Sequence, residues 1–263
     1  MQKINHNNVS ALKNWFSGYV KEFRYEDYES QQNIDLKLQH SQRVAEEITA
    51  IGKHMGLNDN ELNLTQIIAL FHDVGRFEQY DKYRTFSDHK SEDHAELGIK
   101  ILKRHNILEI FDADIQNLIF CSIRYHNRRS LPLGETDDCL FYSRLLRDAD
   151  KLDIWKVVTE YYHRKGERAN ATLVLELPDT PGISHEVHYA LTNKNIVDIK
   201  DVKNINDLKL LQAGLVYDLN FKPSFQFTKN RHYLESLRDS LPETKEITEI
   251  FSILKSYVED RSA

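Results

Sequence analysis

The fold is decided by Phe71-His72-Asp73-Val74-Gly75-Arg76, in which a His-Asp pair ends an apolar run. Adjacent residues on a helix point about 100° apart, so His72 and Asp73 can both touch only a small object placed between them. Imidazole and carboxylate together suit divalent first-row metals, which makes a metal ion the expected object. We expect Gly75 and Arg76 to end this helix and to leave a cation at its mouth. Two side chains cannot hold a metal alone, so other parts of the chain must supply further ligands.

The composition bounds the class of protein. With 263 residues the chain can form one large domain or two small ones, and its low content of 9 Gly and 5 Pro favours helices over a loop-rich β fold. A net charge of -6 gives no support for a nucleic-acid or membrane partner. Cys121 and Cys139 are too few for a disulfide framework or a thiolate metal site. Together with the absence of a basic stretch before an apolar core at the N-terminus, they favour a cytoplasmic protein in a reducing cytosol.

Apolar residues recur with helical spacing along most of the chain, which predicts an all-α fold. The segment 78–93 is polar and has no period, so we expect a long functional loop there. Thr172 to Leu177 alternates enough to suggest one short strand. No internal repeat or clear linker is present, which favours a single helical domain over 1–263 with its last third as a scaffold. The predicted helices span 9–30, 33–56, about 58–73, about 92–102, 112–126, 138–164, 184–194, about 204–217, 224–239 and 243–259.

Several polar residues lie on apolar stripes or at helix ends of these predicted helices. Burying such groups without compensation costs several kcal/mol each, and isolated charges cost more. A shared metal centre removes that cost. The inward polar set is His40, His72, Asp73, His94, His126 and Asp150.

With these residues the sequence resembles the HD-domain superfamily of metal-dependent phosphohydrolases. The pattern is one histidine, then a His-Asp pair, then a distant aspartate in an Ala-Asp-Lys-Leu segment, here Ala149 to Leu152. The resemblance covers about 36–156, which would form the metal-binding core, with 165–263 as a helical extension packed on it. It implies an HD-like helical bundle in which four residues hold the first metal: His40, His72, Asp73 and Asp150.

Members of this superfamily with two metals add histidines between the His-Asp pair and the last aspartate. His94 and His126 look like those added ligands, and Asp73 would then bridge both ions. With one metal, the two histidines would instead contact the substrate phosphate. The sequence has Asn127 where the cyclic-dinucleotide phosphodiesterases carry a second histidine, and it lacks their Gly-Tyr-Pro signature, so cyclic di-GMP hydrolysis is not supported.

Other charged residues are candidates for catalysis or phosphate binding. Arg76 and Lys151 could bind phosphate oxygens, and Asp148 could act as a general acid or orient a ligand histidine. Arg128 and Arg129 could do the same as Arg76, but cations are favourable at a helix C-terminus in any case. His89 and Lys90 could close on a substrate from the polar loop, although plain solvent exposure explains them better.

The resemblance implies a phosphohydrolase that uses one or two divalent ions (Mn, Fe, Ni, Co, Zn or Mg) per chain. A metal lowers the pKa of bound water toward about 7, and the metal-bound hydroxide attacks phosphorus. The expected partner is a small phosphorylated substrate or a nucleotide, with no nucleic acid and no membrane, and a homodimer is left open. One alternative is a di-iron oxygenase of HD-like fold, which uses the same ligand list. Another is a nucleotide sensor that keeps the site but turns over slowly.

Overall fold

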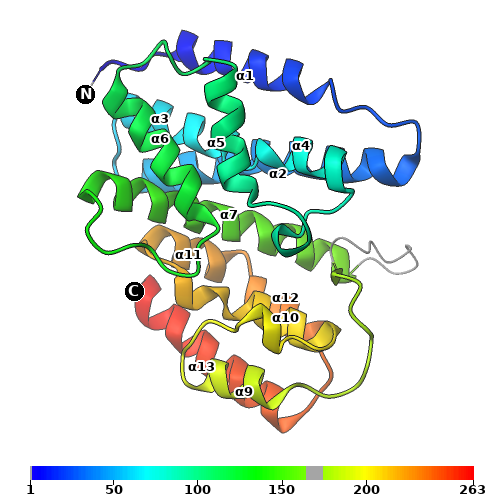
Figure 1. Cartoon of the computed structure of the whole chain (residues 1–263). Coiled ribbons are helices and arrows are strands. Elements are labelled where there is room, and N and C mark those ends of the chain that lie inside the picture. The colour runs from blue at the N-terminus through cyan, green and yellow to red at the C-terminus, as the bar shows by residue number, and fades with distance from the viewer. Residues whose placement is uncertain (1, 164–173) are drawn as a thin grey trace. The chain divides into compact units, whose positions relative to one another are not determined.

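The computed structural model of the chain describes residues 2–163 and 174–263, and all regular elements of this part of the chain are helices (Figure 1). The predicted all-α fold is therefore confirmed for these residues. The chain divides into two compact units, Met1–Asp150 and Lys151–Ala263, which we describe separately. The prediction of a single domain with an extension packed on a metal-binding core stays a prediction.

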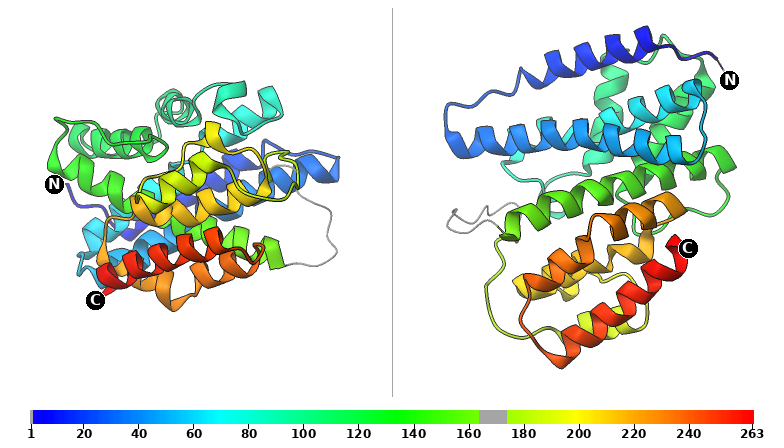
Figure 2. Two further views of the ribbon diagram at one scale, coloured as in Figure 1. Left: turned by 90° about the horizontal axis from the view of Figure 1, so that it is seen from below. Right: turned by 180° about the vertical axis from the view of Figure 1, so that it is seen from behind.

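The N-terminal unit contains six helices and the first half of a seventh. The helix α3 packs on α1, α2 and α6, and α5 packs on α4 and α6. Figure 2 shows the long blue α2 running beside the cyan α3. The bounds are α1 (His6–Val20), α2 (Tyr28–His54), α3 (Asp59–Phe71), α4 (Gly75–Tyr83), α5 (His94–Arg104), α6 (Ala113–His126) and α7 (Asp137–His163), with a short 3-10 helix η1 (Asp88–Lys90) between α4 and α5.

Apolar stripes and capping residues explain these helices. Val44, Ile48 and Ile51 of α2 are buried, as are Ile67 and Ile68 of α3. Helix starts are marked by side chains that accept hydrogen bonds from free backbone N–H groups. These N-caps are Asn58 for α3, Asp93 for α5 and Asp112 for α6.

Two predictions for the N-terminal unit were wrong. Residues 9–30 do not form one helix, because α1 ends at Val20 and Asp27 caps the start of α2 by accepting from the N–H of Ser30. Residues 78–83 are not part of a loop, and Gly75 begins α4 instead of ending α3. The inward face of α4 carries Gln79, which is fully buried, and this polar residue interrupted the apolar period on which the prediction relied.

The C-terminal unit contains the second half of α7 and a set of shorter helices. The helix α13 packs on α9, α11 and α12, and α10 packs on α9 and α12. The remaining bounds are α9 (His185–Thr192), α10 (Ile205–Gly214), α11 (Lys222–Asn230), α12 (Tyr233–Asp239) and α13 (Lys245–Ser262), with 3-10 helices η2 (Ile199–Asp201) and η3 (Leu215–Asp218).

Two predictions for the C-terminal unit also need correction. Residues 224–239 do not form one helix, because His232 has a left-handed backbone (φ 54°) that separates α11 from α12. Residues 174–177 form no strand, and the remainder of the predicted strand, 172–173, lies outside the described residues.

Cys121 of α6 and Cys139 of α7 are joined by a disulfide. Two cysteines were too few to predict a disulfide framework. The single disulfide connects the two helices that carry His126 and Asp150. Within the described parts of the chain, no helix combines the length and the apolar character needed to cross a membrane.

Candidate metal centre

The six residues of the inward polar set come from five helices of the N-terminal unit, and the structure brings them together. His40 lies in the middle of α2, His72 directly follows α3, and His94 is the first residue of α5. His126 is the last residue of α6, and Asp150 lies on α7. Three of the four histidines therefore lie at helix ends that meet at one point.

Gly75 allows α4 and α5 to approach each other at this point. A Cβ atom at Gly75 would overlap the carbonyl oxygen of His94 and would lie 2.7 Å from the amide nitrogen of Gly98. Both are backbone atoms, so they cannot move aside as the end of a flexible side chain can. The glycine therefore keeps His94 close to the His72-Asp73 pair.

The four imidazoles form a continuous chain of buried rings. The ring centroids of His40 and His72 lie 5.1 Å apart, those of His72 and His126 lie 5.0 Å apart, and those of His126 and His94 lie 4.9 Å apart. Their exposed fractions run from 0 % for His72 to 8 % for His40. The Nε2 atoms face one another, at 3.2 Å between His40 and His72 and at 3.0 Å between His94 and His126.

Hydrogen bonds at the opposite ring nitrogen decide where the protons lie. The Nδ1 atom of His72 is 2.7 Å from the carbonyl oxygen of Ala69, and that of His126 is 2.6 Å from the carbonyl oxygen of Ile123. A carbonyl oxygen only accepts, so each Nδ1 carries the proton and each Nε2 presents a lone pair. Burial lowers the pKa of His72 to about 3 and also lowers the pKa of His126, which keeps both rings neutral.

Asp73 stands between the two halves of this chain of rings. Its Oδ1 is 3.2 Å from Nε2 of His94 and 3.8 Å from Nε2 of His126. Its Oδ2 is 3.7 Å from Nε2 of His40 and 3.8 Å from Nε2 of His72. Each carboxylate oxygen thus faces one pair of histidines, which is the arrangement that a bridging ligand requires.

Asp150 completes the half of the site near His40. Its Oδ1 lies 3.1 Å from Nε2 of His40 and 4.0 Å from Nε2 of His72. Its side chain is 19 % exposed, compared with 3 % for that of Asp73, so the site opens to solvent on this side. Burial alone would raise the pKa of Asp150, but the hydrogen bond and charge of His40 and the other histidines hold it below its usual range.

These residues fit divalent metal ions. Neutral imidazole lone pairs and carboxylate oxygens are the donors that first-row metals prefer. Donor atoms of His40, His72 and Asp150 lie within 4.8 Å of one another, and so do those of His72, Asp73 and His126. Two lone pairs that face each other across 3.0 Å, as at His94 and His126, repel unless a cation lies between them. The donor set therefore matches the metal site that the sequence predicts.

Asp88 is a candidate site residue that the sequence pattern did not predict. Its carboxylate oxygens are 2.7 and 2.9 Å from Nδ1 of His94, and Oδ1 also accepts from Arg76 and Gln79. A carboxylate on the far ring nitrogen fixes the tautomer of a ligand histidine and its orientation. The segment 78–93 was expected to be functional, but no local pattern distinguished Asp88 from its polar neighbours.

Asp88, Asp93 and His94 also bring three donor groups close together. Asp93, however, caps α5 by accepting from the N–H groups of Ala95 and Glu96. Asp88 already accepts from four side chains, those of Arg76, Gln79, His94 and Asn127, so both carboxylates have structural partners. This group supports the position of His94 and is less suited to hold a metal of its own.

Lys37 was missed as well. Its Nζ donates to Oδ2 of Asp73 at 2.8 Å and lies 5.5 Å from the ring centroid of Phe86. Lys37 precedes His40 by three residues on α2, so both side chains share one face of that helix. Burial would raise the pKa of Asp73, but Lys37, His72 and Arg76 together hold it well below its usual range.

The remaining predicted catalytic residues have partners in the structure. Arg76 donates to Gln79, to the carbonyl of Phe86 and to Asp88. Lys151, in the C-terminal unit, lies 2.6 Å from Oδ2 of Asp218. Asp148 is fully buried.

Arg147 is a further residue that the sequence did not single out. Its guanidinium donates to the backbone carbonyls of Tyr125, His126 and Arg128, and so it holds the C-terminal end of α6 in place. Arg128 pairs with Asp93 at 3.0 Å and lies 3.8 Å from Glu96. Neither cation was central to the sequence-based prediction, and both now have a structural explanation.

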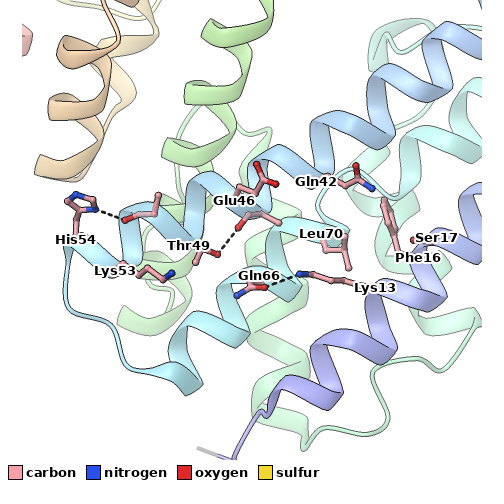
Figure 3. Close-up of a pocket in the computed structure, with 12 residues that line it drawn as sticks. Lys13, Phe16, Ser17, Gln42, Glu46, Thr49, Lys53, His54, Gln66 and Leu70 are labelled. Atoms are coloured by element: carbon pink, nitrogen blue, oxygen red, sulfur yellow. Dashed lines mark hydrogen bonds between the residues drawn. The ribbon is translucent and has the colours of Figure 1, made fainter.

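A cavity of about 670 Å³ lies between α1, α2 and α3, and none of the six predicted ligands lines it (Figure 3). Its floor includes the buried Phe16 and Leu70. Three of its polar side chains have partners within or beside the cavity: Lys13 donates to Gln66, Thr49 donates to the carbonyl of Ala45, and Nδ1 of His54 lies 2.9 Å from the carbonyl of Ala50. No set of donor atoms converges there, so this cavity does not contribute to the metal centre.

Comparison with known proteins supports the family that the geometry suggests. Residues 38–155 match the family model of the HD domain, and this segment contains all six residues of the inward polar set. This segment of the chain is similar to the HD domain. Its similarity to the HD-domain superfamily, predicted from the His-Asp pair, is thereby confirmed.

One solved structure is similar to this chain. It is the crystal structure of a predicted HD superfamily hydrolase from an uncultured Thermotogales bacterium. The identity is 21 %, the match covers 60 % of this chain and 79 % of that one, and the TM-score is 0.39. No curated protein matches the chain.

Proposed function

We propose that this chain is a metal-dependent phosphohydrolase that cleaves a small phosphate ester or a nucleotide. One observation carries the proposal: four imidazoles and two carboxylates converge on one space, and hydrogen bonds at Nδ1 turn the Nε2 atoms of His72 and His126 into it. This happens within the segment that is similar to the HD domain, and the superfamily that the sequence resembles is mostly hydrolytic.

The ligands divide into two sets around Asp73. His40, His72, Asp73 and Asp150 would hold one ion, and Asp73, His94 and His126 would hold a second. A bound divalent ion makes hydroxide available near neutral pH and polarises phosphoryl oxygens. Support for two ions comes from Asp73, each of whose oxygens faces a different pair of histidines.

The side chains around the proposed metal site orient its ligands and leave one side of the site open to solvent. His72, Asp73 and His94 are at most 2 % exposed, so water and substrate cannot reach the site past them. Asp150 and Lys37, whose side chains are each 19 % exposed, mark the side from which a substrate enters. Asp148 is fully buried, which favours a role in positioning its neighbours over contact with a substrate.

The charge of the chain favours a small substrate. The net charge is -6, and a polymer with many phosphates requires a basic groove. The predicted contacts of Arg76 and Lys151 with the phosphate stay predictions, since both side chains have carboxylate partners here.

The decisive experiment is metal analysis of the purified full-length protein, combined with hydrolysis assays on a panel of phosphate monoesters, phosphodiesters and nucleotides. We expect about two divalent ions per chain and hydrolysis that a chelator abolishes and added metal restores. His72→Ala should lose both metal and activity. His54→Ala provides a matched control, because His54 is exposed and lies on α2 together with His40.

Other outcomes would redirect or refute the proposal. About one ion per chain would confine the site to His40, His72, Asp73 and Asp150 and return His94 and His126 to substrate contact. Iron as the main metal, with oxygen consumption and no phosphate release, would identify the di-iron oxygenase instead. A tightly bound nucleotide without turnover would favour the sensor. Absence of metal after gentle purification, with none taken up on titration, would refute the metal site itself.

A further inference from the structure

Lys37 occupies the oxygen of Asp73 that the first metal ion needs. Its ammonium lies 2.8 Å from Oδ2, the same oxygen that faces His40 and His72 at 3.7 and 3.8 Å. An ammonium and a divalent cation compete for the same lone pairs, and they repel each other when both are close. Lys37 and a metal ion held by His40, His72 and Asp73 therefore cannot keep these positions together.

The side chain of Lys37 can move. It is 19 % exposed, whereas that of Asp73 is 3 % exposed, so the lysine reaches the carboxylate from the rim of the site. The four-carbon stem of a lysine is flexible and its ammonium can rotate among several acceptors. The ring of Phe86, with its centroid 5.5 Å from Nζ, offers a cation–π contact that keeps the ammonium at this rim.

The other cations near the site are held more firmly. Arg76 donates to the side chain of Gln79, the carbonyl of Phe86 and the carboxylate of Asp88, and these three bonds hold it in place while its Nε lies 3.4 Å from Oδ1 of Asp73. Arg147 donates to three backbone carbonyls. Lys37 differs from both, because the one hydrogen bond that the structure shows for its ammonium goes to Asp73, at the oxygen that faces His40 and His72.

We propose that Lys37 exchanges partners when the site is loaded, leaving Asp73 for the metal and binding the phosphoryl oxygens of the substrate. This inference rests on the proposed phosphohydrolase function and assigns a substrate-binding residue to it. In the metal-free protein Lys37 neutralises the buried Asp73. In the loaded protein its charge is available at the open side of the site, where a phosphoryl dianion would enter.

The experiment uses the full-length variant Lys37→Met, which removes the charge and keeps most of the apolar stem beside Phe86. The first measurement is titration of the chelator-stripped protein with Mn²⁺. Because a competing cation is gone, Lys37→Met should bind Mn²⁺ at least as tightly as the parent. The second measurement is binding of inorganic phosphate to the Mn²⁺-loaded protein, for which we expect an affinity about 10–100-fold lower, the typical effect of losing a hydrogen bond between charged groups.

Two further variants separate a substrate contact from a structural role. Lys37→Arg keeps a cation at the rim and should restore most of the phosphate affinity. Lys82→Ala removes a lysine that pairs with Glu78 on α4 and should change neither measurement. If Lys37→Met weakens Mn²⁺ binding and leaves phosphate binding unchanged, Lys37 only supports Asp73 and the inference is wrong.

The inference and the proposed function can fail separately. Should the Mn²⁺-loaded parent hydrolyse phosphate esters while Lys37→Met matches its activity and phosphate affinity, only the role of Lys37 is refuted. Should the loaded parent neither bind phosphate nor hydrolyse any ester, the proposed function is refuted and the assignment of Lys37 falls with it.

Discussion

The two units of this chain bury polar side chains for different reasons. In the C-terminal unit, Asp207 is fully buried and accepts hydrogen bonds from the N–H and hydroxyl of Ser184 and from the N–H of Lys203. Each of its oxygens faces donors, and the carboxylate connects the start of α9 to α10. Burial of this polar group is fully explained by local structure.

In the N-terminal unit, acceptors face acceptors. The Nε2 atoms of His94 and His126 are 3.0 Å apart, and both lie near Oδ1 of Asp73. Among the described residues, the groups of His, Asp, Glu and Cys that could hold a metal all lie in this unit. The comparison teaches that burial alone does not mark a functional site. A candidate site is marked where buried acceptors from several helices converge on one another, as the Nε2 atoms of His94 and His126 do.

The strongest test of this difference exchanges one carboxylate in each unit. Asp73→Asn should lose metal and reduce activity by at least about 100-fold, because loss of a bridging ligand should cost more than loss of an outer hydrogen bond to a ligand. Asp207→Asn should bind metal normally and lose about 1–3 kcal/mol of stability, because a buried donor is left without its acceptor. Metal content and denaturant unfolding of both variants measure the two effects. Loss of metal in Asp207→Asn would contradict the division between the units.

A smaller effect is expected at Asp88, which accepts from Nδ1 of His94. Asp88→Asn should lower metal affinity by about 10–100-fold, the usual cost of losing a carboxylate behind a ligand histidine. Asp93→Asn is the matched control, because asparagine caps a helix about as well as aspartate. Titration of both stripped proteins with Mn²⁺ gives the answer. Equal losses in the two variants would mean that Asp88, Asp93 and His94 hold a metal themselves.

The comparison also shows what a sequence can reveal. The six residues predicted as ligands share one signal, because each is a polar residue on an apolar helical stripe or at its end. The structure brings these residues together, and their role as ligands stays a prediction. Lys37 and Asp88 could not be found in this way, since they lie at the rim or in a polar segment where further polar residues carry no signal. Their roles depend on the approach of α2, η1 and α5 to one point, which is a property of packing.

The predictions of secondary structure were wrong where the local sequence pattern and the tertiary packing favour different conformations. Residues 78–83 are helical although the buried Gln79 breaks the apolar period. Gln79 can be buried because its amide donates to Asp88, Ser91 and the carbonyl of Glu92, which lie outside this helix. The break between α11 and α12 depends on the left-handed backbone of His232, a conformation that histidine seldom adopts. The disulfide between Cys121 and Cys139 likewise depends on the packing of α6 against α7 and not on spacing.

One glycine in each unit lies in close contact with a neighbouring helix, so an alanine substitution at each tests the packing there. Gly75→Ala places a Cβ atom on the backbone of α5, and we expect a loss of about 1–3 kcal/mol together with weaker metal binding. Gly214→Ala in the C-terminal unit meets the side chain of Leu191, which can rotate, so it should cost less and leave the metal content unchanged. Thermal unfolding and metal analysis of both variants measure this. A Gly214→Ala variant that is the less stable of the two would show that the contact at Gly75 is not a tight one.

The last expected effect is a dependence of stability on pH. The pKa of His72 is lowered to about 3 in the folded protein, and that of His126 is also lowered, while an unfolded histidine titrates near 6.5. The unfolded state therefore binds more protons below pH 6.5, so the stabilisation by these neutral rings is fully present above pH 6.5. The part from His72 is lost as the pH falls toward 3, and the part from His126 is lost as the pH falls through its lowered pKa. Each ring contributes a slope of up to about 1.4 kcal/mol per pH unit within this window.

Denaturant unfolding of the metal-free protein between pH 8 and pH 5 tests this dependence, since most carboxylates titrate below that range. His72→Gln should remove about one proton from the slope and leave the contribution of His126. If His72→Gln and the parent respond to pH identically, the rings of the N-terminal unit are not held neutral by burial. The contrast between the two units would then rest on geometry alone.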